Sequence, residues 1–329
     1  MRVVAVLAAA AILLAGALAV GAARLLSPVD PQAPDRIVVI RPGASTSEIA
    51  ATLQEAGIIR SASHFILAAR VRGVARSLRD GEYRFSPAMP LLRIVDVLVR
   101  GEVVLHPITI PEGFTADQIV RTLTRAGLGD AGRLRALTRR GAGQFEYDFL
   151  RGVPGGNLEG YLFPDTYYIP RFLDEREVVD RFLSQFAQTV VPLWREVGTG
   201  RPLHEIVTMA SMVEREAKSP GDQPLIAGVL YNRLARGWRL EVDATVLYAL
   251  GGHKPVVTYE DLKVNSPYNT YLHAGFPPGP IANPGLGAIR AALHPARTDY
   301  FFYVARPDGS HAFSRTLSEH LANVRRFRR

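Results

Sequence analysis

The sequence contains no cysteine among its 329 residues, which excludes disulfides, thiol catalysis and cysteine-ligated metal sites. Its eight histidines are scattered, and no two of them stand at the spacing of a metal-ligand pair. We therefore expect neither a bound metal nor a cofactor.

Long apolar runs are also scarce, because the chain has a single one, Val3 to Ala23. As a helix it would be about 31 Å long, which matches the hydrocarbon core of a bilayer. Ala17-Leu18-Ala19 could serve as a signal-peptide cleavage site, but the run is longer than the apolar part of most signal peptides. We expect an uncleaved membrane anchor at 1–24, a proline-containing linker at 25–36 and an exported remainder.

Acidic residues are fewer than lysine and arginine, 31 against 39, so the formal net charge is +8. The pI is about 9.9. An anionic polymer or a membrane surface is therefore a suitable partner. We expect no nucleic-acid partner, because the arginines are dispersed and no known nucleic-acid-binding module is recognisable.

An internal repeat follows the linker. The segment "VVIRPGASTSEIAATLQEAGI" (38–58) matches "ITIPEGFTADQIVRTLTRAGL" (108–128) without a gap. Each copy predicts a short strand, a glycine turn and a helix that ends at a glycine. Each helix opens with a capping box, Ser45-x-x-Glu48 in the first copy and Thr115-x-x-Gln118 in the second. A gapless match with matching caps favours duplication over chance.

The pattern predicts an α+β protein with a small module at 37–105 and a larger mixed α+β domain at 106–329. The small module should contain a helix at 62–71, a strand at 81–85 and a helix at 91–100. Helices in the larger domain are expected near 115–126, 130–139, 175–196, 203–217, 223–236, 244–250, 285–293 and 317–327, with strands near 300–304 and 312–314. The rigid segment "FPPGPIANPGLG" (276–287) is expected to form one wall of a cleft.

The stretch "TMASMVEREA" (208–217) places two acids in an otherwise apolar helix. Glu214 and Glu216 lie on opposite edges of the apolar stripe and should not share one cleft, whereas Arg215 should face solvent. Loss of hydration would raise the pKa of such a carboxyl, as a general acid requires. The alternative is an ordinary solvated glutamate paired with an arginine, and the helical positions alone do not choose between the two acids.

Aromatic and amide side chains gather in four segments around "NLEGYLFPDTYYIP" (157–170), "YNRL" (231–234), "LEVDATVLYAL" (240–250) and "NSPYNTYLHAGFPPGPIANPG" (265–285). Tyrosine faces can stack on sugar rings, and asparagines can bond hydroxyl and acetamide groups. Each of these residues alone is as ordinary as any buried tyrosine or turn asparagine. Together, in an exported chain, they favour a carbohydrate-binding groove.

The motifs "ASMVEREA", "YNRL", "DATVLYAL", "SPYNTY", "PPGPIANPG", "ALHPA" and "LEGYLFPDTY" resemble, in order, those of the MltG (YceG-like) family of endolytic peptidoglycan transglycosylases. Ala244 departs from the family pattern, which has proline there. The resemblance assigns the catalytic acid to Glu214. From the chemistry of their side chains we also expect substrate contacts from Glu159, Tyr161, Asn232, Asp243, Tyr268, Asn269 and Tyr271. Glu159 could instead simply brace the loop "LEGYLFPDTY". The module at 37–105 loosely resembles the LysM-like fold, which binds amino-sugar polymers.

The resemblance implies a lyase that cuts nascent glycan strands between N-acetylmuramic acid and N-acetylglucosamine and leaves 1,6-anhydromuramyl ends. It further implies a single-pass protein of the inner membrane, with an extracytoplasmic catalytic domain and peptidoglycan synthases as partners. Two alternatives stay open. One is a non-catalytic peptidoglycan-binding scaffold, and the other is a muramidase that uses Glu159 or Asp243 as a second carboxylate. Asp243 could equally be the N-cap of the helix at 244–250.

Overall fold

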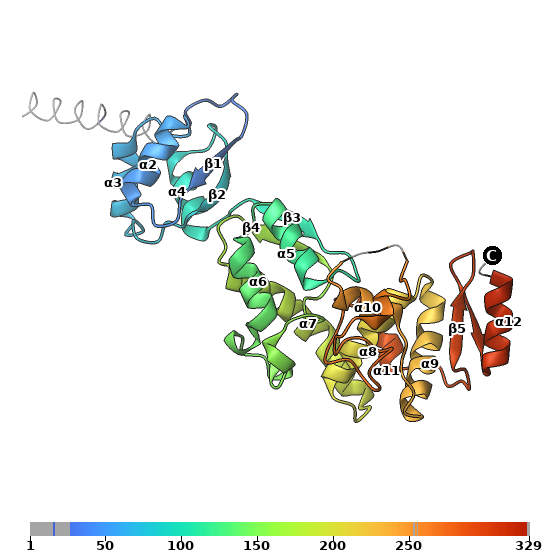
Figure 1. The fold of residues 1–329 in the computed structure, drawn as a ribbon. Coiled ribbons are helices and arrows are strands. Elements are labelled where there is room, and N and C mark those ends of the chain that lie inside the picture. Colours follow the sequence, from blue (N-terminus) through green and yellow to red (C-terminus); the bar gives the residue numbers. More distant parts are fainter. Residues whose placement is uncertain (1–15, 17–26, 253, 255, 328–329) are drawn as a thin grey trace, which may run out of the picture. The chain divides into compact units, whose positions relative to one another are not determined.

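The computed structural model describes residues 16, 27–252, 254 and 256–327. The expected membrane anchor and the first two linker residues lie outside these residues, apart from Gly16. No helix within the described part of the chain is both long and apolar enough to cross a membrane. The chain divides into two compact units (Figure 1). The first reaches His106 and includes Tyr168–Phe172, and the second holds Pro107–Tyr167 and the chain from Leu173 onward.

Within residues 27–106, the first unit is an antiparallel strand pair with three helices. Strand β1 (Arg36–Ile40) pairs with β2 (Gly81–Phe85) so that Val38 lies opposite Tyr83. The helices are α2 (Thr46–Glu55), α3 (Ala62–Val71) and α4 (Leu91–Arg100). The expected bounds of α3, β2 and α4 are confirmed, because each apolar pattern is bounded by strong turn or cap residues.

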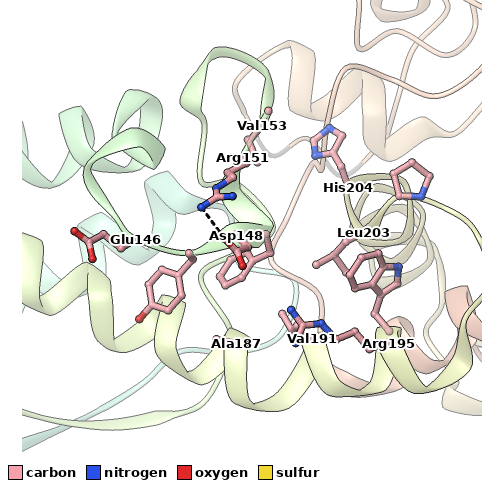
Figure 2. A pocket seen from close by; sticks show the side chains of 14 residues that line it. Glu146, Asp148, Arg151, Val153, Ala187, Val191, Arg195, Leu203 and His204 are labelled. Carbon is pink, nitrogen blue, oxygen red and sulfur yellow. Dashed lines mark ion pairs between the residues drawn. The ribbon is translucent and has the colours of Figure 1, made fainter.

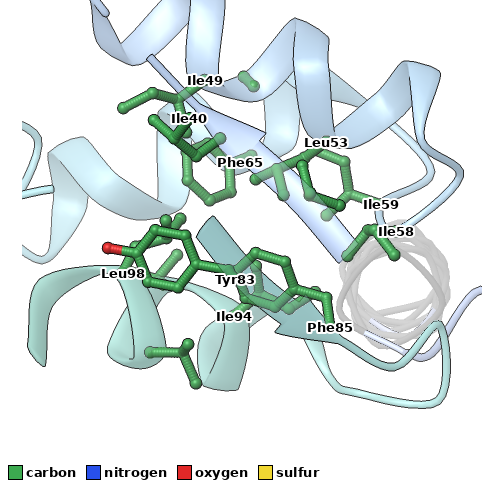
Figure 3. Packing of buried hydrophobic residues seen from close by; sticks show 14 of the residues in the cluster. Ile40, Ile49, Leu53, Ile58, Ile59, Phe65, Tyr83, Phe85, Ile94 and Leu98 are labelled. Atoms are coloured by element: carbon green, nitrogen blue, oxygen red, sulfur yellow. The ribbon is translucent and has the colours of Figure 1, made fainter. Parts of the chain in front are cut away.

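The core of the first unit is formed by side chains from every one of these elements (Figure 3). The rings of Tyr83 and Phe85 stack with centroids 5.4 Å apart, and Phe65 from α3 is fully buried beside them. The Tyr83 hydroxyl donates to the Arg79 carbonyl at 2.8 Å, which satisfies the one polar atom that this large side chain brings into the core. Burial raises the pKa of Tyr83 to about 12, so the phenol stays neutral.

The two copies of the repeat have the same local structure. In the second copy, β3 (Leu105–Thr109) leads through a turn into α5 (Ala116–Arg125). Both expected capping boxes are confirmed. The turn glycines Gly43 and Gly113 have φ of 76° and 74°, a conformation that favours glycine. β3 pairs with β4 (Thr166–Pro170), a strand that the sequence analysis missed.

The second unit is mainly helical and ends in a small hairpin. Its helices lie within one or two residues of the expected positions: α6 (Ala131–Arg140), α7 (Glu175–Val197), α8 (Leu203–Glu216), α9 (Gln223–Ala235), α10 (Asp243–Ala249), α11 (Leu286–Leu293) and α12 (Leu317–Phe327). Strands β5 (Phe302–Ala305) and β6 (His311–Ser314) pair antiparallel and pack against α12.

Helix α8 is the buried helix around which the second unit packs, since it contacts α9, α10 and α11 (Figure 1). All residues from 206 to 213 are buried, so the helix is enclosed along more than the single stripe that the sequence predicted. Its two buried hydroxyls are satisfied locally. Thr208 donates to the His204 carbonyl at 2.7 Å, and Ser211 donates to the Thr208 carbonyl at 2.7 Å. α8 is therefore a rigid support for the acids in its last turn.

Candidate active site

Glu214 lies in the last turn of α8 and is half-buried. Its Oε2 accepts a hydrogen bond from the backbone N–H of Gly285 at 3.2 Å. Burial raises the pKa of Glu214, and the negative charge of Glu112 raises it further. The Gly285 N–H and the Arg215 guanidinium oppose this rise because both stabilise the ionised form. The raised pKa expected for a general acid is thus present at Glu214.

A turn from Pro111 to Phe114 borders Glu214. Gly113 donates its N–H to the Asn283 carbonyl at 2.9 Å, and Asn283 donates its N–H to the Phe114 carbonyl at 2.8 Å. Arg215 Nη1 donates to the Gly113 carbonyl at 3.3 Å. Arg215 keeps part of its surface exposed, so the expectation that it faces solvent holds only in part, because its guanidinium also bonds to this turn. The turn and the last turn of α8 form one bonded unit.

The segment 276–287 runs alongside α8 in the same direction. The Pro278 carbonyl lies 2.9 Å from His204 Nε2, and Ile281 donates its N–H to Ser211 Oγ at 3.0 Å. Further along the segment, the bond from Gly285 to Glu214 is the third link. Bonds at the start, middle and end of the helix hold the segment in a fixed register. Its position supports the expected role as a wall beside the acid.

Glu216 lies on the other side of the helix end. Its carboxylate accepts from the Tyr303 hydroxyl at 3.1 Å and from the backbone of Ala244. Part of the residue is exposed, but its carboxyl group is desolvated, and burial together with the charge of Asp243 raises its pKa to about 7. Glu214 and Glu216 thus contact different segments, as the helical positions predicted.

Glu159 is placed as a brace for its loop, the alternative to a substrate contact that the sequence left open. It is 4% exposed, and its Oε1 accepts from the Ala116 N–H at 2.8 Å and from Asn283 Nδ2 at 3.0 Å. Oε2 accepts from the Tyr248 hydroxyl at 3.3 Å. Burial raises its pKa to about 8, so the carboxyl is mostly protonated at neutral pH. Glu159 is therefore a buried brace between the Ala116 backbone, Asn283 and Tyr248.

Two further expected substrate contacts are also buried. Tyr161 has no exposed surface, its ring packs against Phe149 and Phe186, and its hydroxyl lies 2.9 Å from His204 Nδ1. Asn269 is fully buried and donates through Nδ2 to the carbonyls of Leu262 and Val264. Both side chains stabilise the fold, and neither is available to a sugar.

The remaining expected contacts keep part of their surface exposed. Asp243 accepts from the Tyr271 hydroxyl at 2.5 Å and is the first residue of α10, so it does not cap that helix through its side chain. Tyr268 packs its ring 4.9 Å from that of Tyr248. Asn232 donates to the carbonyls of Thr298 and Tyr300. Tyr268 and Tyr271 keep the exposure that a sugar-stacking role requires.

A cavity of about 810 Å³ lies beside the start of α8, where Leu203 and His204 line it (Figure 2). Glu214 is in the last turn of that helix, at its other end. Its lining comes from residues 146–149, 151–153, 187, 191, 194–195 and 202–204 and includes none of the expected site residues. Arg151 and Asp148 form an ion pair of 2.9 Å at its edge. His204 and Glu214 are about 15 Å apart along the helix axis, so this cavity is separate from the candidate active site.

One residue at the site was missed by the sequence analysis. Glu112, in the turn of the second repeat copy, lies against the α-carbon of Gly285, where an added Cβ would collide with the Glu112 carboxyl group. A residue with a Cβ at this position would displace the end of the Glu112 side chain. The signal in the sequence was the acid at a turn position where the first copy has Pro42.

The chain resembles known proteins over most of its length. The sequence model of the YceG-like family matches residues 38–326 of this chain. A Bacillus subtilis protein named endolytic murein transglycosylase is 34% identical over 310 residues, which cover 90% of this chain and 86% of the relative. A Streptococcus pneumoniae protein of the same name is 29% identical, and the match covers 91% of this chain but 60% of the relative.

A solved structure agrees with these matches. The crystal structure of a yceG-like protein from Listeria monocytogenes is 33% identical, with a TM-score of 0.59, and the match covers 88% of this chain and 99% of that one. This neighbour supports the mixed α+β fold. The sequence match and the fold together lead to one conclusion: the chain belongs to the YceG-like family.

Proposed function

We propose that the protein is an endolytic murein transglycosylase with Glu214 as its general acid and base. The observation that carries this proposal is the half-buried Glu214 carboxyl with its raised pKa, held by Gly285 in a chain of the YceG-like family. Relatives from Bacillus subtilis and Streptococcus pneumoniae are named for this activity. The substrate is peptidoglycan, and the bond cut joins N-acetylmuramic acid to N-acetylglucosamine.

We propose different tasks for the two carboxyl oxygens of Glu214. Oε2 accepts from the Gly285 N–H, so the proton for catalysis is carried on Oε1. Glu214 donates this proton to the glycosidic oxygen as the bond from that oxygen to C1 breaks, and positive charge develops at C1.

The second half of the reaction uses the same residue as a base. Ionised Glu214 takes the proton from the C6 hydroxyl of the muramyl sugar, and O6 bonds to C1. The product is a 1,6-anhydromuramyl end, and Glu214 is again protonated. No water is consumed, because the internal hydroxyl reacts at high effective concentration.

We further propose that residues 1–24 anchor the protein in the inner membrane, with both units on the extracytoplasmic side. The first unit is proposed to be a LysM-like module that holds glycan strands, and the cutting of nascent strands fits a partnership with peptidoglycan synthases. The apolar run at 3–23 and the net charge of +8 support contact with a membrane and an anionic polymer. Sedimentation with peptidoglycan of a fragment spanning residues 27–104 tests the glycan-binding role.

Mass spectrometry of glycan products tests the proposed activity. The full chain in detergent is incubated with uncrosslinked peptidoglycan strands, alongside Glu214→Gln and the exposed control Glu260→Gln. We expect 1,6-anhydromuramyl ends from the wild type and from Glu260→Gln. We expect a loss of about 100-fold or more in Glu214→Gln, the usual contribution of a general acid. Reducing ends would instead identify a muramidase, and intact glycan that sediments with the protein would identify a binding scaffold.

A further inference from the structure

The turn of the second repeat copy has a feature that the first copy lacks. The two turns share their backbone conformation at Gly43 and Gly113, yet the residue before the glycine is Pro42 in one and Glu112 in the other. Proline suits a turn for local reasons, because its φ is fixed. A glutamate brings no such benefit, so its presence beside Glu214 calls for another explanation.

Glu112 and Glu214 both lie against Gly285. Glu214 accepts from the Gly285 N–H, and the Glu112 carboxyl lies over the α-carbon of the same residue. Glu112 is exposed, and among the described residues it forms no hydrogen bond or ion pair. Cationic side chains are plentiful, because the net charge is +8. None of those in the described residues forms an ion pair with Glu112. Two neighbouring carboxylates repel each other when both are ionised, so the arrangement does not stabilise the fold.

We infer that Glu112 is a second carboxylate of the active site, which stabilises the positive charge that develops at C1 of the muramyl sugar. This inference rests on the proposed function. A negative charge beside a developing cation lowers the energy of the transition state more than that of the neutral substrate. The assignment replaces Glu159 and Asp243 as the second acid of the site.

The charge of Glu112 also acts on Glu214 itself, because it raises the pKa of that carboxyl. Both effects favour the reaction at neutral pH: more Glu214 is protonated in the free enzyme, and the cation is better stabilised. Glu112 does not replace the C6 hydroxyl as the group that attacks C1, so the product keeps its 1,6-anhydro ring.

The test compares Glu112→Gln, Glu112→Asp and the control Glu260→Gln in the full detergent-solubilised chain. The rate of anhydro-end formation on uncrosslinked strands is measured as kcat/KM across pH. We expect Glu112→Gln to lose on the order of tenfold or more at every pH. Its alkaline limb should also move to lower pH, because Glu214 loses a neighbouring negative charge. Glu112→Asp, which keeps the charge on a shorter side chain, should recover part of the rate.

A purely structural role would lower the melting temperature without moving the pH profile, so both are recorded. A Glu112→Gln enzyme with the wild-type rate and the wild-type pH profile would overturn the inference. Wild-type protein that makes no anhydro ends would instead refute the proposed function, and the inference with it. The two failures are therefore distinguishable.

Discussion

At the residue scale, the protonation of Glu214 is set first by burial, which raises its pKa, and then by its neighbours. The Gly285 N–H and Arg215 lower the pKa, whereas the charge of Glu112 raises it. A general acid must be protonated in the free enzyme, so kcat/KM should fall as the pH rises through this pKa. The position of the alkaline limb therefore reports on these neighbours.

Arg215→Gln is expected to move the alkaline limb to higher pH. The substitution removes the positive charge that favours ionised Glu214, so the acid keeps its proton further into the alkaline range. The shift is opposite in sign to that expected for Glu112→Gln. Measurement of kcat/KM from pH 5 to 9 checks it, and shifts of the same sign in both variants would contradict this electrostatic account.

The buried Glu159 predicts a pH-dependent stability. Its folded pKa of about 8 lies above the ordinary value of 4.5, so the folded state binds the proton more tightly. The contribution of Glu159 to the free energy of unfolding is complete below about pH 4.5. It is lost as the pH rises through about 8, at about 1.4 kcal/mol per pH unit within that window.

Glu159→Gln should remove this part of the dependence of unfolding free energy on pH. Glutamine keeps an oxygen that accepts from the Ala116 N–H, and it does not ionise. Thermal unfolding of the wild type and the variant from pH 5 to 9 measures the difference. Exposed Glu260→Gln is the matched control. Parallel wild-type and Glu159→Gln profiles would mean that this carboxyl is not buried as described.

At the element scale, Asn283 joins the three segments that form the site. It is fully buried, and its Oδ1 accepts from the N–H groups of Gly160 and Leu162, both at 2.9 Å. Its Nδ2 donates to the Phe114 carbonyl and to Glu159. The position of Gly285, two residues further on, depends on these bonds.

Asn283→Ala is expected to lower the free energy of unfolding by about 3 kcal/mol, since it leaves two buried N–H groups without acceptors. Activity per folded molecule should also fall, because the Gly285 N–H is no longer held at Glu214. Urea unfolding and product assays below the transition measure the two effects. Asn323→Ala, which removes one bond to Ser314 far along the chain, should leave activity unchanged.

Helix positions could be predicted from the sequence because caps, glycines and apolar periodicity are local signals, as the boxes at Ser45 and Thr115 show. The acid Glu214 was predicted through the family resemblance. Glu112 was missed because its closeness to Gly285 depends on contacts between segments more than 160 residues apart. The burial of Glu159 and Asn269 could not be predicted for a related reason: the same residue types form groove surfaces and buried braces, and only the packing of the folded chain distinguishes the two.

At the scale of the whole molecule, the first unit has a core of its own, formed by residues between Val38 and Leu98. We predict that a fragment of residues 27–104 folds alone and unfolds cooperatively on heating, as followed by circular dichroism. Phe65→Ala should destabilise it by about 3–5 kcal/mol, because a large buried ring is removed. Leu67→Ala on the same helix is the control, since Leu67 is 58% exposed. A fragment without a cooperative transition would contradict this prediction.

The three bonds between α8 and the segment from Pro278 to Gly285 make the length of that segment part of the active site. Inserting or deleting one residue between Ile281 and Gly285 displaces the last amide by up to about 3.5 Å, more than a hydrogen bond tolerates. Natural or engineered variation in this segment can therefore change side chains but not residue number. Alignments of relatives should show substitutions here without gaps, and directed-evolution libraries should be designed with the length fixed.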